Sequence, residues 1–231
     1  ARANVADTEV LTFNVLLYLA IFVTLQVGFR DSEVRKTVQK VETVRETLTE
    51  GWEFVREVAS FRYLMFAMAA LAICDVIVEF RFIAVSDLAY PDPASYQRFY
   101  SLYRLGYILA AFVIQTFVTA SAVEKFGLKQ IFLFLPVASL VSLGGMALVP
   151  GIVVATGGLL LEKLAAYAVD EPSRKSFQAL VPEERRGRVS IFMDSYLYAG
   201  GSIVGILLTG LVTVLGRVLA FEGYTYVYLG L

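Results

Sequence analysis

The most constraining feature of this sequence is a dense block of charge, Val169–Arg188, between two long apolar runs. Residues 151–169 precede the block and residues 189–215 follow it, and each run approaches or exceeds the roughly 20 apolar residues that cross a bilayer as a helix. The sequence therefore predicts that the block is a water-facing loop between two membrane spans. The side on which this loop lies would fix the orientation of the whole chain.

The composition is typical of a polytopic membrane protein. Hydrophobic residues make up 58% of the chain and charged residues 18%, whereas soluble domains have about 45–50% and about 25%. The net charge of −1 gives no indication of a nucleic-acid partner. With no histidine and a single cysteine, Cys74, the sequence predicts no cofactor, no metal site and no disulfide within the chain.

Apolar runs predict an all-α transmembrane bundle with about six to seven spans. They cover residues 10–29, 63–85, 99–123, 131–149, 152–169 and 189–215, and an incomplete seventh run starts at residue 224. Valines recur at helical spacing from Val34 to Val44 with charges on the other face, which predicts an amphipathic linker over residues 30–62, with its helix ending near Gly51. Three parts follow: residues 1–29, the linker, and a membrane bundle over residues 63–231. Because the chain starts at Ala1 and stops within a run, we expect a piece of a longer protein.

The distribution of Lys and Arg predicts the orientation. Residues 30–62, 124–130 and 162–188 hold seven, two and six of the 20 basic residues, whereas the opposite loops and span ends hold three, Arg98, Arg104 and Arg217. Basic residues concentrate in short cytoplasmic loops. Loops 30–62, 124–130 and 162–188 are therefore predicted to be cytoplasmic, in what we expect to be a bacterial inner membrane.

This pattern resembles the C-terminal half of a major facilitator superfamily transporter, preceded by the last span of the N-terminal half. A long charged segment follows the first span, and the stretch from Ala120 to Gln130 is similar to a loop motif of the family, although Ala120 and Leu128 depart from it. Val181–Ser190 is similar to the loop before the eleventh helix of that family. Asp75–Phe82 and the stretch from Asp170 to Ser176 look most like the branch of ATP/ADP translocase-like nucleotide exchangers.

The resemblance implies half of a 12-helix fold that works by alternating access around a site near the midplane of the membrane. It implies transport of a small, anionic, nucleotide-like solute across the lipid bilayer. The missing N-terminal half, or other membrane subunits, would then be partners.

Asp75, Glu79 and Arg81 carry charge deep in the second run. Asp75 and Glu79 share a helix face, whereas Arg81 lies well round the helix from both. Charges within a membrane cost at least about 2.5–3.5 kcal/mol each on insertion scales, so they face a cavity or a partner. One hypothesis is a site for an anionic substrate at Arg81 and for coupling at an acid. The alternative is a structural ion pair with another helix, or a position nearer the interface.

Further candidates lie on the third and fifth runs. Arg104, Tyr107 and Gln115 fit one broad face that would line a polar cavity, with Arg104 binding phosphate or carboxylate. The alternative for Arg104 is an interfacial position at the outer end. Glu162 and Lys163 are expected to extend to the cytoplasmic surface, or to line the cavity.

The cytoplasmic turns supply candidates for a gating latch by resemblance to the family. These residues are Glu124, Lys125, Gly127, Lys129, Arg185 and Arg188. The alternative is a set of solvated turns that follow the positive-inside bias. Basic loops could also touch anionic lipid, but their mixture with acidic residues argues against a polybasic anchor. The Gly201-x-x-x-Gly205 spacing predicts a close helix contact.

These patterns favour a membrane transporter of small organic anions over an enzyme, because no catalytic constellation is present. The alternative is a membrane scaffold or accessory subunit of a larger complex that does not transport. Its charged cytoplasmic segments would then be docking surfaces.

Overall fold

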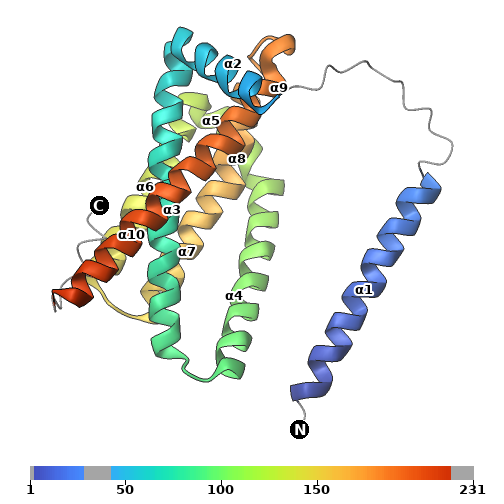
Figure 1. The fold of residues 1–231 in the computed structure, drawn as a ribbon, viewed down its shortest axis with the longest axis vertical. Helices are drawn as coiled ribbons and strands as arrows, with labels where there is room; N and C mark the ends of the chain where they lie inside the picture. The colour runs from blue at the N-terminus through green and yellow to red at the C-terminus, as the bar shows by residue number, and fades with distance from the viewer. Residues whose placement is uncertain (1–2, 29–42, 220–231) are drawn as a thin grey trace. The chain divides into compact units, whose positions relative to one another are not determined.

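A computed structural model of the chain describes residues 3–28 and 43–219, which are helical apart from short turns (Figure 1). The chain divides into two compact units, Ala1–Glu42 and Thr43–Leu231. The first unit contains α1 (Ala3–Gly28), in which the apolar stretch among the described residues is Val15–Gly28. Residues 30–42 of the predicted linker and the predicted seventh run lie outside the described residues.

Four stretches of the second unit are long and apolar enough to cross a membrane: Ala59–Ala89, Pro93–Gly127, Ile152–Gln178 and Glu183–Val218. The described residues thus form an all-α protein with the helices of an integral membrane protein. The helix α6 (Phe134–Leu148) has 15 residues, about 22 Å at the usual rise, which is short of a hydrocarbon core of about 30 Å. The expected count of six to seven spans is therefore not supported.

Three of the four long stretches are built from joined helical segments, each with a π-helical section in its middle. The exception is the first stretch, which is the single helix α3 (Ala59–Ala89). The second consists of α4 (Pro93–Ile114), η1 (Gln115–Thr119) and α5 (Ala120–Ile131), and the third of α7 (Ile152–Leu164), η2 (Ala165–Asp170) and α8 (Glu171–Gln178). The fourth consists of α9 (Glu183–Ile191), η3 (Phe192–Leu197) and α10 (Tyr198–Val218). Figure 1 shows α2 (Val44–Glu57) across the end of this bundle, beside α9.

The charged block Val169–Arg188 is not the loop that the sequence predicts. Helix continues through η2 and α8 to Gln178, only residues 179–182 leave it, and α9 begins at Glu183. Charged side chains of this block form ion pairs on the helices, such as that of Arg174 with Asp170. They therefore do not need the water that would surround a loop.

Two other predicted turns also differ. Helix α5 runs through most of residues 124–130, and the break is confined to Gly127, whose φ of 73° is a conformation that favours glycine. Gly51 does not end the amphipathic helix. It is buried inside α2, where a Cβ atom would lie 2.5 Å from Cβ of Phe192, so its lack of a side chain lets α2 pack on η3.

Helix α4 begins at a capped end next to the Pro91–Pro93 turn. Asp92 is its N-cap, and its carboxylate accepts hydrogen bonds from Ser95 N at 2.9 Å and Ser95 Oγ at 2.8 Å. These bonds hold the pKa of Asp92 below its usual range.

Helices α3 and α10 pack closely because glycine lies at their crossing. A Cβ on Gly201 would be 2.7 Å from Cβ of Ala72 and 2.8 Å from the carbonyl oxygen of Ala69, and one on Gly205 would be 3.0 Å from Cβ of Val76. This confirms the contact predicted from the glycine spacing. By contrast, α4 has no buried residue and exposes large apolar side chains such as Leu102 and Phe112, as a lipid-facing helix does.

Candidate functional site

A group of charged and hydroxyl side chains joins three helices inside the bundle. Lys163 on α7 lies with its Nζ 2.6 Å from Oδ1 of Asp75 and 3.3 Å from Oε2 of Glu79, both on α3. Tyr198, the first residue of α10, donates a hydrogen bond of 2.7 Å to the other oxygen of Asp75. The side chains of Asp75 and Lys163 are each 15% exposed. The lysine therefore neutralises charge that the sequence places within the spans.

Two cavities meet at this group. The first has a volume of ≈ 230 Å³ and the second of ≈ 420 Å³. Tyr167 and Tyr198 line both, whereas Asp75 lines the first and Lys163 the second. The Asp75–Lys163 ion pair thus lies at the boundary between the two cavities.

Half of the residues that line the first cavity are charged. Five carboxylates and two basic side chains contribute to it: Asp75, Glu162, Asp170, Glu171, Asp194, Arg174 and Lys175. The acidic excess makes this cavity unfavourable for an anion and favourable for a cation or a proton. Among the described residues, however, no group of three His, Cys, Asp or Glu side chains is arranged to hold a metal ion.

The second cavity is lined by tyrosines and carries a different charge. The tyrosines follow one face of α4 in a row, with ring centroids 6.0 Å apart for Tyr96 and Tyr100, 6.1 Å for Tyr100 and Tyr103, and 6.5 Å for Tyr103 and Tyr107. Tyr167 on η2 extends the row, 6.2 Å from Tyr107. The charged residues of this lining are Glu79, Arg104 and Lys163. Because Lys163 is paired with Asp75 and Glu79, Arg104 supplies the positive charge beside the aromatic rings.

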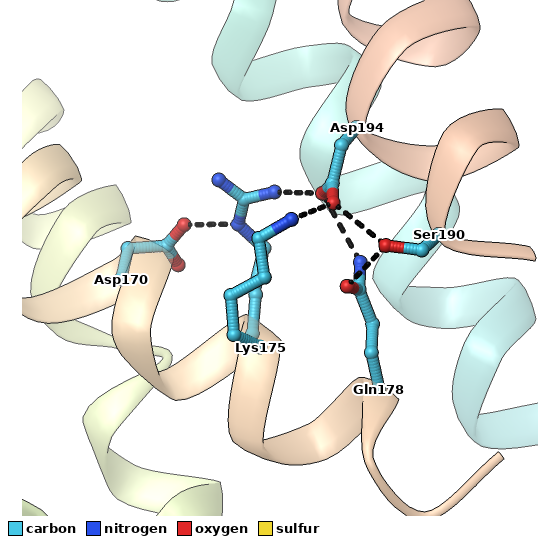
Figure 2. Close-up of polar contacts among 6 residues, drawn as sticks. Asp170, Lys175, Gln178, Ser190 and Asp194 are labelled. Carbon is cyan, nitrogen blue, oxygen red and sulfur yellow. Dashed lines mark hydrogen bonds and ion pairs between the residues drawn. The ribbon is translucent and has the colours of Figure 1, made fainter. Parts of the chain in front are cut away.

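A second polar cluster contributes Asp170, Arg174, Lys175 and Asp194 to the first cavity. Figure 2 shows Asp194 on η3 facing three side chains of α8 and Ser190 of α9. Arg174 Nη1 lies 2.7 Å and Gln178 Nε2 3.1 Å from Oδ1 of Asp194, and Lys175 Nζ bonds to Oδ2. Ser190 Oγ lies 3.2 Å from Oδ2.

The same cluster extends to the end of η2. Nε of Arg174 donates to Asp170 at 2.7 Å, so one guanidinium bridges the two aspartates (Figure 2). The cluster therefore fastens α8 to η3 and α9.

The π-helical segments place several of these side chains. A π turn leaves backbone groups without their usual partners and occurs frequently at functional sites. In η2, two of these carbonyls are satisfied from η1: Gln115 donates to the carbonyl of Tyr167 at 2.8 Å, and Thr119 to that of Ala168 at 2.5 Å. This bonding fixes Tyr167, which lines both cavities.

Glu162 is the most deeply buried carboxylate at the first cavity, with 1% of the residue exposed. Ser139 of α6 donates to its Oε1 at 2.9 Å, whereas its Oε2 is buried and has no hydrogen-bond partner among the described residues. The expectation that Glu162 and Lys163 extend to the cytoplasmic surface is therefore wrong. These neighbours point to different helices because they lie about 100° apart on α7.

The structure brings most of the predicted membrane residues together. Asp75, Glu79 and Lys163 form one group, and Arg104 and Tyr107 line the cavity beside it. Arg81 is partly buried and lines neither cavity. Gln115 bonds to backbone and lines neither cavity.

The predicted gating residues separate into two places. Arg185 and Arg188 lie on α9 and pair with α2: Arg188 binds Glu50, and Arg185 lies 3.5 Å from Glu57. Glu124, Lys125 and Gly127 lie on α5, where the side chains of Glu124 and Lys125 are exposed. The Lys129 side chain is outside the description.

Sequence reasoning named Tyr107 but missed the other tyrosines, Glu162 as a buried group, and the bonds around Asp194. The positions 96, 100, 103 and 107 recur at helical spacing, so this row was visible in the sequence. No sequence signal marks Tyr198 as the partner of Asp75, which is 123 residues away.

Comparison of the chain with protein-family models, with curated proteins and with solved structures finds no match.

Proposed function

We propose that this chain is part of a membrane transporter that moves a small organic anion, nucleotide-like in character, by alternating access. The observation that carries the proposal is the pair of cavities that meet at the Asp75–Lys163 ion pair inside the bundle. A path that joins the two cavities would pass this boundary. Breaking and re-forming one ion pair would open it toward one cavity at a time.

The charge of the second cavity supports an anionic solute. Arg104 and Lys163 face it with one acid, Glu79, and a guanidinium binds carboxylate or phosphate through two parallel hydrogen bonds. The acidic first cavity would not hold an anion in the same way. An anion at Lys163 would also compete with Asp75 for the ammonium, which couples solute binding to the breaking of the ion pair.

The tyrosine row supports a solute with a planar ring. Offset or edge-on ring contacts add about 0.5–1.5 kcal/mol beyond the burial of area, and the row from Tyr96 to Tyr107 offers several ring faces. The volume of ≈ 420 Å³ falls within the range of about 300–1,000 Å³ that is usual for small-molecule sites.

The proposal includes the facilitator-type architecture and the orientation expected from the sequence. The second unit would form the main part of one six-helix half, with the short helix α6 as one of its members and the charged end cytoplasmic. A second half, as in other transporters built from repeats, would supply the opposite wall of the path. The inner-membrane location belongs to the same proposal.

The test begins with binding by the full chain purified in detergent. A panel of organic anions (nucleotides, sugar phosphates and dicarboxylates) is screened by the shift that each causes in the midpoint of thermal unfolding. We expect at least one ring-bearing anion to raise the midpoint, and Arg104→Gln to remove the shift. Arg98→Gln is the matched control, since Arg98 is an exposed arginine of α4 that does not line the cavity.

Transport is tested separately with the anion that binds. Proteoliposomes loaded with that anion are supplied with the labelled form outside, and exchange is followed over time for the parent, Asp75→Asn and Arg104→Gln. Exchange by the parent that both substitutions reduce at least tenfold supports the proposal. Absence of binding by every anion in the panel would contradict it.

The second candidate is a membrane scaffold that does not transport. It is favoured by the mutual pairing of Asp75, Glu79 and Lys163, which can serve as a structural ion pair with no need of a solute. In that case Asp75→Asn lowers the thermal midpoint but no anion changes it, and the chain is recovered from membranes with a stable partner subunit.

A further inference from the structure

The helix α2 carries three distinct faces, and the structure assigns a partner to two of them. One face is buried: Thr47, Gly51, Phe54 and Val55 pack against the end of the bundle. A second face is acidic, with glutamates at positions 46, 50, 53 and 57. Glu50 binds Arg188 and Glu57 lies 3.5 Å from Arg185, so α9 neutralises part of that face.

The third face of α2 is apolar and exposed. Val44, Leu48 and Trp52 recur every four residues and so form one stripe. They are 60%, 38% and 50% exposed, respectively. Arg45 and Arg56 lie between this stripe and the glutamates, and they are exposed as well. No ion pair of either arginine is found among the described residues.

The length of α3 fixes the depth of α2 in a bilayer. Helix α3 has 31 residues, about 46 Å at the usual rise, whereas the hydrocarbon core is about 30 Å thick and the whole bilayer with headgroups about 40–45 Å. When α3 is centred in the bilayer, its first turn lies among the headgroups. Val58 is the single residue between α2 and α3, so α2 lies at that level too.

We propose that the third face of α2 is a binding surface for anionic phospholipid. Trp52 and Leu48 enter the boundary between headgroups and acyl chains, where tryptophan is enriched. Arg45 and Arg56 bind the phosphates. In the sequence, the acidic residues of this segment argue against such a surface. The structure reduces that objection, because the arginines of α9 pair with two of the glutamates, Glu50 and Glu57.

The chain offers a direct reporter of this contact, since Trp52 is its one tryptophan. The full chain is reconstituted in phosphatidylcholine bilayers that contain rising fractions of phosphatidylglycerol, with bromine on the acyl chains of one lipid at a time. Bromine quenches tryptophan fluorescence on contact, so the two quenching curves give the preference of the site around Trp52 for the anionic lipid.

We expect brominated phosphatidylglycerol to quench Trp52 more strongly than brominated phosphatidylcholine at equal fraction, and the difference to shrink with added salt. Arg45→Gln and Arg56→Gln should each weaken the preference about fivefold, the factor that one basic residue contributes near an anionic surface. Arg98→Gln makes the same charge change near the start of α4, which follows the end of α3 opposite to α2. This variant should leave the lipid preference unchanged.

Two results would overturn the proposal. Equal quenching by both lipids in the parent chain would show that the face contacts lipid without preference for charge. No quenching by either would show that a protein segment covers Trp52. Both readouts are independent of transport, so the lipid surface and the proposed function are tested separately.

Discussion

The two polar clusters of the second unit differ in how fully their carboxylates are bonded. Asp194, at the charged end, has Arg174, Lys175, Gln178 and Ser190 within hydrogen-bond distance. Asp75, in the middle of α3, has Lys163 and Tyr198. A fully bonded buried network holds its helices in one arrangement, whereas a sparsely bonded one can be broken by a competing ligand. We therefore expect the end cluster to act as a clamp that holds its helices together, and the middle cluster to be the part that rearranges.

The largest expected effect is loss of stability on removal of the clamp. Asp194→Ala leaves Arg174, which is 17% exposed, with one aspartate in place of two, and removes the bonds of three further side chains. Breaking one partner out of a buried ionic network costs about 3–5 kcal/mol, and the partial exposure here places the expected loss near about 3 kcal/mol. Thermal unfolding in detergent measures it. A fall no larger than that of Ser190→Ala, which removes only the bonds of one hydroxyl to Gln178 and Asp194, would contradict the clamp.

The middle cluster should give a smaller loss of stability and a larger loss of function. Asp75→Asn removes the ion pair, but Glu79 remains 3.3 Å from Lys163 and retains part of its neutralisation. We expect about 2 kcal/mol of destabilisation, as for a hydrogen bond to a charged group, together with at least a tenfold fall in anion exchange. Equal losses of stability in Asp75→Asn and Asp194→Ala would remove the distinction between the clusters.

The sequence allowed part of the middle cluster to be predicted, because charge in an apolar run is conspicuous. Asp75, Glu79 and Lys163 were found in this way, although Lys163 was expected at the surface. The sequence could not show that Glu162 faces α6 while Lys163 faces α3, since α7 is apolar on every side. The end cluster was mistaken for a loop, because Asp194, the partner of its basic residues, lies beyond the charged block.

The helices themselves were largely predictable from hydropathy, whereas their ends and inner distortions were not. Apolar runs predicted the regions of α3, α4 and α7, and glycine spacing predicted the contact of α10 with α3. The π-helical segments leave no mark on the apolar pattern. They depend on bonds between distant helices, such as that from Gln115 to the carbonyl of Tyr167.

The substitution Tyr198→Phe measures what the hydroxyl group contributes to the middle cluster, apart from the charged groups. The substitution removes the 2.7 Å hydrogen bond to Asp75 and leaves the ion pair, so the expected loss of stability is about 1 kcal/mol. Because Tyr198 lines both cavities, we also expect the rate of anion exchange to change. The measurement is the rate of exchange at saturating anion alongside the thermal midpoint. A loss of stability as large as that of Asp75→Asn would mean that the hydroxyl, not the ion pair with Lys163, supplies most of the stability at Asp75.

The smallest effect is expected at Glu162, next to Lys163 on the same helix. Its Oε2 has no partner among the described residues, and its Oε1 accepts one bond from Ser139. The substitution Glu162→Gln keeps an oxygen for Ser139, removes a buried carboxyl beside Asp75, and changes the volume little. A buried polar group without a partner costs free energy, so the thermal midpoint should stay the same or rise.

This outcome would separate Glu162 from Asp75, although both carboxylates line the first cavity. Ser139→Ala is the matched control, because it removes the single bond of Glu162 and leaves the carboxyl. A fall in the midpoint for Glu162→Gln as large as that for Asp75→Asn would show that Oε2 is held by a partner outside the described residues. A rise would place Glu162 among groups kept at a cost in stability, which is the expected signature of a functional carboxyl within a membrane span.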